Sequence, residues 1–219
     1  LKFNWPNKSP KILLLGAHSD DIEIGCGGTI LNLCSQNIEP EIYWIVFSAN
    51  KKRKEEALSS ANNFLISIKK KNIVVHDFKE NYFPYNASKI KESFDDLGKF
   101  FNPDLIFTHY KSDLHQDHKL IYDFTLNTFR NHLILEYEIP KYDGDLGSPH
   151  LFFSLEKIIL DTKIKHINKN FQTQKNKPWF SEETFRALPR LRGIESRSPS
   201  GYAEAFHCRK MNLSNPKSH

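Results

Sequence analysis

The sequence predicts an α/β fold in a single domain, with a mostly parallel sheet between layers of helix. Short apolar runs alternate with amphipathic stretches up to about residue 130, and this alternation is typical of parallel strands joined by crossover helices. The first apolar run ends in His-Ser-Asp-Asp and continues through three glycines. Polar residues in that position lie at the sheet edge where open α/β folds bind ligands. No internal repeat or linker divides residues 1–219.

The elements follow in order from local patterns. A polar lead-in with two prolines (residues 1–10) precedes an apolar run of the kind that a buried parallel strand shows. Ser48 or Asn50 can cap the second helix, Asn102-Pro103 ends the third, and Ser181 with two glutamates behind it opens the last. Strands are expected at residues 11–17, 41–47, 72–78, 105–109, 133–139 and 202–208. Helices are expected at residues 29–36, 52–68, 88–101, 116–130 and 155–171, with another behind Ser181.

Composition and charge exclude several classes of protein. Hydrophobic residues make up 39% of the chain, and no apolar run is long enough to span a bilayer. The net charge is +5, but the lysine runs at 51–54 and 69–71 lack interleaved aromatic residues, which disfavours a nucleic-acid partner. Three cysteines without metal spacing and the lack of a secretion signal favour a reducing, cytoplasmic location.

Two clusters of metal-binding residue types each follow a predicted strand. His18 and Asp21 lie after the first strand, and His118 lies in a His-Gln-Asp-His sequence after the fourth. Either cluster alone is more typical of a turn or helix cap. Together they supply the three ligands that a catalytic zinc needs, although other divalent ions bind the same donors. We therefore expect one zinc or similar ion per chain.

Three further residues have side chains suited to hydrolysis beside such a metal. Asp20 lies next to the expected ligands without being one, so its carboxylate can take a proton from water activated by the metal. His115 is one helical turn from His118 and can reach the oxygen that becomes negative when water attacks a carbonyl. Asp117 could hold His115 in one tautomer and favour its protonated form.

Other residues near these clusters have less specific interpretations. The glycines at 25, 27 and 28 do not fit Gly-X-Gly-X-X-Gly and indicate close helix-on-sheet packing rather than a phosphate-binding turn. Asp113 could order the loop before His115 or merely turn it. His109, at the end of a strand, is expected to be structural. The loop at 141–147 is expected to line or cover a substrate pocket built by residues from about 136 to 219.

The motifs resemble those of the LmbE/PIG-L family of zinc-dependent N-deacetylases. Residues 17–29 resemble the amino-terminal Ala-His-Pro-Asp-Asp motif with its glycine cluster, and residues 115–118 resemble the second motif, His-Pro-Asp-His. Arg53 with Glu56 and Ala57 is similar to the family's Arg-X-X-Glu-Ala helix start. Residues 192–193 and 202–206 resemble its carboxy-terminal signature. Ser19 and Gln116 replace prolines and Ile22 stands where many members have Glu, but no ligand is lost.

The resemblance implies a Rossmann-like three-layer sandwich and a hydrolase that removes an N-acetyl group from an amino sugar or sugar conjugate, in glycan, envelope or secondary-metabolite synthesis. The roles it implies are zinc binding by His18, Asp21 and His118, general base catalysis by Asp20, oxyanion stabilisation by His115 with help from Asp117, and substrate contact by Arg53. The alternatives are a zinc amidohydrolase on a non-sugar amide and a metal-binding member without turnover. A nucleotide-binding module is disfavoured by the acidic loop.

The expected partner is a small N-acetyl sugar, and the chain is compatible with a homo-oligomer. The basic run at 51–54 follows the second strand and should lie on the same rim as the metal. Arg53 could then fork a phosphate or hold sugar hydroxyls, and with the basic character of the chain this predicts a phosphate- or nucleotide-linked sugar. The alternative is that the lysine excess reflects overall composition and not the ligand.

Overall fold

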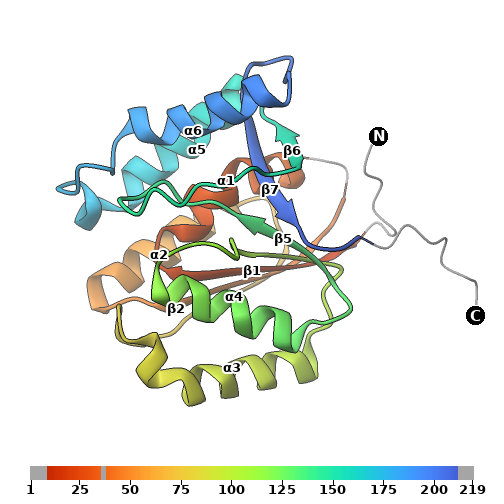
Figure 1. Cartoon of the computed structure of the whole chain (residues 1–219), viewed down its shortest axis with the longest axis vertical. Coiled ribbons are helices and arrows are strands. Elements are labelled where there is room, and N and C mark those ends of the chain that lie inside the picture. Colours follow the sequence, from red (N-terminus) through yellow and green to blue (C-terminus); the bar gives the residue numbers. More distant parts are fainter. Residues whose placement is uncertain (1–8, 36–37, 212–219) are drawn as a thin grey trace, which may run out of the picture.

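A seven-stranded sheet forms the centre of the computed structural model, which describes residues 9–35 and 38–211 (Figure 1). The strand order is β3-β2-β1-β4-β5-β7-β6. The first five strands are parallel, whereas β7 runs antiparallel to both β5 and β6. The strands are β1 (Lys11–His18), β2 (Glu41–Ser48), β3 (Lys70–Val75), β4 (Leu105–His109), β5 (Leu133–Tyr137), β6 (Leu151–Ser154) and β7 (Ala203–Cys208).

Helices cover both faces of the sheet, which confirms the three-layer α/β sandwich. Successive β1 residues point to opposite faces, so Leu14 packs in the core under α1, α2, α5 and α6, whereas Leu13 packs in the core with α3 and α4. The helices are α1 (Asp21–Cys34), α2 (Lys51–Phe64), α3 (Ala87–Phe100), α4 (Gln116–Thr128), α5 (Lys157–Asn170) and α6 (Glu182–Glu195), with short 3-10 turns η1 (Phe83–Asn86) and η2 (Gln172–Gln174). Among the helices of the described residues, none is both long and apolar enough to cross a membrane.

The structure corrects two of the predicted elements. Helix α1 begins at Asp21, not at Thr29, so all three glycines lie inside it. They are required there because a Cβ on Gly25 would lie 2.2 Å from the Tyr137 ring, and one on Gly27 would lie 2.7 Å from Phe64. This supports the close-packing interpretation. Strand β6 was not predicted, because a strand of four residues gives a weak sequence pattern. Among the strands of the described residues, it pairs with β7 alone.

Other boundaries differ from the prediction by a few residues, as expected of frayed element ends. Asn50 caps α2 by accepting from Arg53 N, and Ser181 caps α6 by accepting from Thr184 N. Helix α2 ends at Phe64 rather than residue 68, and β3 begins at Lys70 rather than residue 72. Residues 1–8 of the lead-in and residue 36 of the predicted first helix lie outside the described residues.

Candidate metal and catalytic site

The three expected ligands meet at the carboxyl edge of the sheet. His18 is the last residue of β1, Asp21 is the first residue of α1, and His118 lies in the first turn of α4. Strands β1 and β4 are parallel neighbours, so the segments that follow them lie side by side. All three side chains are buried.

The distances between the ligand atoms suit a small metal ion. His18 Nδ1 lies 3.1 Å from His118 Nε2, and Asp21 Oδ2 lies 3.5 Å from each of these nitrogens. Ligands around a tetrahedral zinc, at about 2.0–2.1 Å from the ion, are about 3.3 Å apart. These three side chains therefore fit the bound metal that the sequence predicts.

The outer nitrogen of each histidine contacts a carboxylate. His18 Nε2 lies 3.1 Å from Asp117 Oδ2, and His118 Nδ1 lies 2.8 Å from Asp113 Oδ2. When these outer nitrogens donate, the lone pairs of the inner nitrogens face the same point. Metal-ligating histidines have such outer partners in most proteins. Asp113, left open by the sequence, is thus the partner of His118.

The charges around the three candidate ligands favour a cation at the point where their ligand atoms meet. Burial by itself lowers the pKa of His18, but the carboxylates of Asp21 and Asp117 outweigh it and raise that pKa to about 10. Burial raises the pKa of Asp21, yet the neighbouring imidazoles hold it well below its usual value. Burial, with His109, lowers the pKa of His118 to about 3. The ionised Asp21 carboxylate and the unprotonated His118 imidazole are donors that a divalent cation takes, and such a cation would displace the proton that Asp21 and Asp117 favour on His18.

Asp20 lies beside the cluster with a free oxygen. The side chain is buried, and within the described part of the chain its Oδ2 has no hydrogen-bond partner. Burial raises the pKa of Asp20 to about 6, while the charge of Arg53 opposes this rise. A carboxylate with this pKa and an open oxygen is suited to accept a proton near neutral pH.

The Arg53 guanidinium is paired with neighbouring side chains of the site. The sequence predicted instead that this group would be available to bind a phosphate. Its Nε donates to Ser19 Oγ at 3.0 Å, its Nη1 contacts Glu80, and its Nη2 lies 3.6 Å from Asp20 Oδ1. Ser19, which replaces the family's proline, therefore makes a contact that a proline could not. Glu80 was missed by the sequence analysis because it follows β3 in a loop without any motif.

His115 and Asp117 are arranged differently from the prediction. His115 caps α4, and its Nδ1 accepts from the backbone N–H of Asp117 at 3.2 Å. The Asp117 carboxylate instead accepts from Asn81 N and Phe83 N and contacts His18. Burial and the charge of His18 lower the pKa of His115. The structure thus favours a neutral His115 with its proton on Nε2, rather than the protonated form expected.

His109 also belongs to the cluster, although it was expected to be only structural. Its Nε2 lies 3.3 Å from Asp21 Oδ2 and accepts from Ala17 N at 2.9 Å, and its ring stacks on His118 with centroids 3.9 Å apart. Asp21, His109 and His118 form a second group whose ligand atoms all lie within 4.8 Å of one another. The only sequence signal was its position at the end of the fourth predicted strand.

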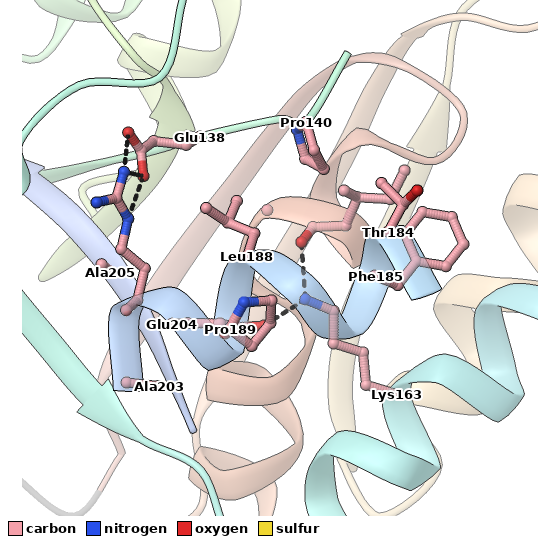
Figure 2. Close-up of a pocket in the computed structure, with 13 residues that line it drawn as sticks. Glu138, Pro140, Lys163, Thr184, Phe185, Leu188, Pro189, Ala203, Glu204 and Ala205 are labelled. Atoms are coloured by element: carbon pink, nitrogen blue, oxygen red, sulfur yellow. Dashed lines mark hydrogen bonds and ion pairs between the residues drawn. The ribbon is translucent and has the colours of Figure 1, made fainter. Parts of the chain in front are cut away.

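A cavity separate from the candidate ligands lies between α1, α5, α6 and the segment after β5 (Figure 2). Its wall carries a buried ion pair, in which Lys163 Nζ donates to Glu204 Oε1 at 2.6 Å and to Ile24 O at 2.7 Å. Glu138 and Arg192, a second buried pair, also line it. Residues of the carboxy-terminal signature, Arg192 and Ala203 to Ala205, therefore line this cavity and not the cluster of candidate ligands.

The family comparison identifies the class of protein. The family model described as PIG-L: GlcNAc-PI de-N-acetylase matches residues 13–129, more than half of the chain. The chain belongs to this family of deacetylases, which hydrolyse amide bonds. The Uncharacterized deacetylase YaiS of Escherichia coli (strain K12) is 24% identical over 173 residues, which cover 75% of this chain and 92% of that relative.

Solved structures share the fold at low sequence identity. The N,N'-diacetylchitobiose deacetylase from Pyrococcus horikoshii aligns with a TM-score of 0.67 and 18% identity, covering 91% of this chain and 84% of that one. GalB, the 4-carboxy-2-hydroxymuconate hydratase from Pseudomonas putida KT2440, aligns with a TM-score of 0.69 and 14% identity, covering 95% and 100%. Because a deacetylase and a hydratase share this fold, the fold alone does not fix the reaction.

Proposed function

We propose that the chain is a metal-dependent N-deacetylase that hydrolyses the N-acetyl group of an amino sugar or sugar conjugate. The observation that carries the proposal is the buried His18–Asp21–His118 cluster with the open Asp20 carboxylate oxygen beside it. Family membership supports amide hydrolysis. The chitobiose deacetylase of the same fold supports a sugar substrate. Free cysteines at 26, 34 and 208 support a cytoplasmic location.

His18 through Nδ1, Asp21 through Oδ2 and His118 through Nε2 would hold zinc or another divalent cation. When bound, such a cation polarises a carbonyl oxygen and lowers the pKa of water. Asp20 Oδ2 takes the proton of the attacking water and passes it to the nitrogen of the leaving amine. Burial keeps this carboxylate away from bulk water, and Arg53 keeps it ionised.

His115 is placed to stabilise the negative oxygen that forms during attack. One of its ring nitrogens lies within 4.8 Å of the ligand atoms of His18 and His118. With Nδ1 accepting from Asp117 N, the Nε2–H is available to donate to the carbonyl oxygen of the substrate. Asp117 acts by orienting both histidines, through its backbone on His115 and its carboxylate on His18.

Arg53 and Glu80 form the rim on the side of Asp20. Because the Arg53 guanidinium is paired with Glu80 and Asp20, it offers little free charge to a phosphate. We propose that this pair contacts hydroxyl groups of the sugar, and that a phosphate or nucleotide carrier is not required.

The reaction is tested by mass spectrometry on a panel of free and conjugated N-acetyl sugars, together with non-sugar N-acetyl amides. The expected result is loss of one acetyl group and release of acetate from a sugar. Hydrolysis of only non-sugar amides would favour the alternative amidohydrolase. Addition of water to an unsaturated acid, without amide hydrolysis, would contradict deacetylation and point to the reaction of the hydratase neighbour.

Arg53→Gln is expected to move the acidic limb of the pH profile to higher pH. Asp20 acts as a base only when ionised, so kcat/KM falls as pH drops through its pKa. Because Arg53 lowers that pKa, its removal raises it by about one unit or more. Arg53→Lys retains the positive charge, so the acidic limb is expected to stay at the pH of the wild type. A raised KM with an unshifted limb would show that Arg53 contacts the substrate but does not set the pKa of Asp20.

A further inference from the structure

The loop between β5 and β6 is held at two points, with an exposed tip between them. At one end, Gly147 N donates to Glu138 Oε1 at 2.7 Å, and Gly147 O accepts from Arg192 Nη2 at 2.9 Å. At the other end the loop is held by Lys141. Between the two, the ring of Tyr142 is exposed at the tip (72% for the residue).

Lys141 lies in a surface loop, yet its side chain is only 10% exposed. Its Nζ is 3.0 Å from Asp113 Oδ2 and also donates to Asp145 Oδ2. Both carboxylates are buried. A lysine buried to this degree is normally paired, and here it joins two carboxylates that would otherwise repel each other. Asp145 in turn accepts from Leu114 N at 2.7 Å.

Asp113 connects this contact to the metal cluster. The oxygen that faces Lys141 is also 2.8 Å from His118 Nδ1. The other oxygen accepts from His115 N at 2.9 Å. One carboxylate therefore contacts the loop, a candidate ligand and the backbone of the candidate oxyanion residue.

We propose that Lys141 is a positioning residue that latches the loop to the metal site, so that the place of the loop and the orientation of His118 depend on each other. This rests on the proposed function, because it takes His118 as a metal ligand. If the latched loop holds Asp113 and His118 in the geometry that binds metal, then bound metal must favour the latched loop by the same factor. The tip with Tyr142 is then fixed beside the site when metal is bound.

The loop is tested by limited digestion of the full chain with chymotrypsin. Cleavage after Tyr142 is compared with cleavage after Tyr85, which is 82% exposed at η1 and serves as an internal reference. In the wild type, added zinc is expected to slow cleavage after Tyr142. In Lys141→Met the cleavage is expected to be several-fold faster and insensitive to zinc, whereas Lys141→Arg keeps the wild-type behaviour.

Metal affinity is measured on the same proteins by competition with a chelator. Loss of an outer partner typically weakens metal binding 10- to 100-fold, and we expect about tenfold for Lys141→Met because it acts through Asp113. Lys111→Met removes an exposed lysine from the neighbouring loop and is expected to change neither readout.

Unchanged metal affinity in Lys141→Met overturns the proposal, whether or not cleavage becomes faster. If this variant does not fold, Asp145→Asn tests the same contact from the loop side. If Asp145→Asn is cleaved after Tyr142 at the wild-type rate, the proposal is contradicted. If the wild-type chain deacetylates sugars and Lys141→Met binds zinc with unchanged affinity, only the role of Lys141 is contradicted and the proposed function stands. A wild-type chain that binds no metal contradicts the proposed function, and the latch with it.

Discussion

Replacing Asp20 with asparagine is expected to lower kcat about 10²- to 10⁴-fold while leaving the metal content unchanged. The factor is that of a lost general base. Asp20 Oδ2 has no partner in the described part of the chain, so asparagine keeps the shape of the side chain and removes its ability to take a proton, together with the negative charge that faces Arg53. Turnover of the substrate found in the panel and metal analysis of chelator-free protein are measured together.

Asp21→Asn is the matched control, because it makes the same change one residue away. Asp21 Oδ2 lies 3.5 Å from the inner nitrogens of both histidines, so this variant is expected to lose metal and, through it, activity. If Asp20→Asn loses the metal and Asp21→Asn retains it, the roles of the two aspartates are exchanged. If neither variant changes the metal content or the turnover, the proposal that hydrolysis takes place at this cluster is wrong.

The fold and the grouping of the site residues could be predicted because both depend on local pattern and one topological rule. Apolar runs identified the parallel strands, and neighbouring parallel strands end at the same edge, which brought His18 and His118 together. The start of α1 could not be predicted, because glycine inside a helix is locally unfavourable by about 1 kcal/mol. The reason for glycine at this position is tertiary packing, since Tyr137 leaves no room for a Cβ on Gly25.

The outer contacts of the site were the least predictable part. Asp117 was assigned to His115 from its spacing, but its carboxylate turns to His18 and to the backbone of residues 81 and 83. Glu80 and Lys141 come from loops that carry no motif, and only the folded chain brings them to Arg53 and Asp113. Such contacts depend on side-chain direction across elements, which spacing along the chain does not encode.

The signature residues outside the metal motifs have mostly structural partners. Glu56 of α2 accepts from Thr173 N at 2.9 Å and from its hydroxyl, which fixes the segment after α5. Arg192 of α6 pairs with Glu138 and holds Gly147. Glu204 of β7 accepts from Gly28 N and Thr29 N at 2.8 and 2.6 Å, in the middle of α1. These contacts tie the later elements to the helix that carries Asp21.

Lys163→Met is expected to lower the free energy of unfolding by about 3–5 kcal/mol, the cost of leaving a buried charge without its partner. Lys163 is 2% exposed, and its ammonium contacts the Glu204 carboxylate and the Ile24 carbonyl. Methionine fills similar space but pairs with neither, so the buried Glu204 carboxylate loses its ammonium partner and retains the backbone N–H groups of Gly28 and Thr29. The loss is measured by urea unfolding.

Lys157→Met makes the same substitution on the same helix and serves as the control. Lys157 pairs with Asp161 at the surface, with its side chain 71% exposed, and solvent-exposed pairs contribute little to stability. The double variant Lys163→Met, Glu204→Gln removes the charge that the single variant leaves unpaired, so it is expected to be more stable than Lys163→Met alone. Equal unfolding free energies for Lys163→Met and Lys157→Met would show that the buried pair does not hold α1 in place.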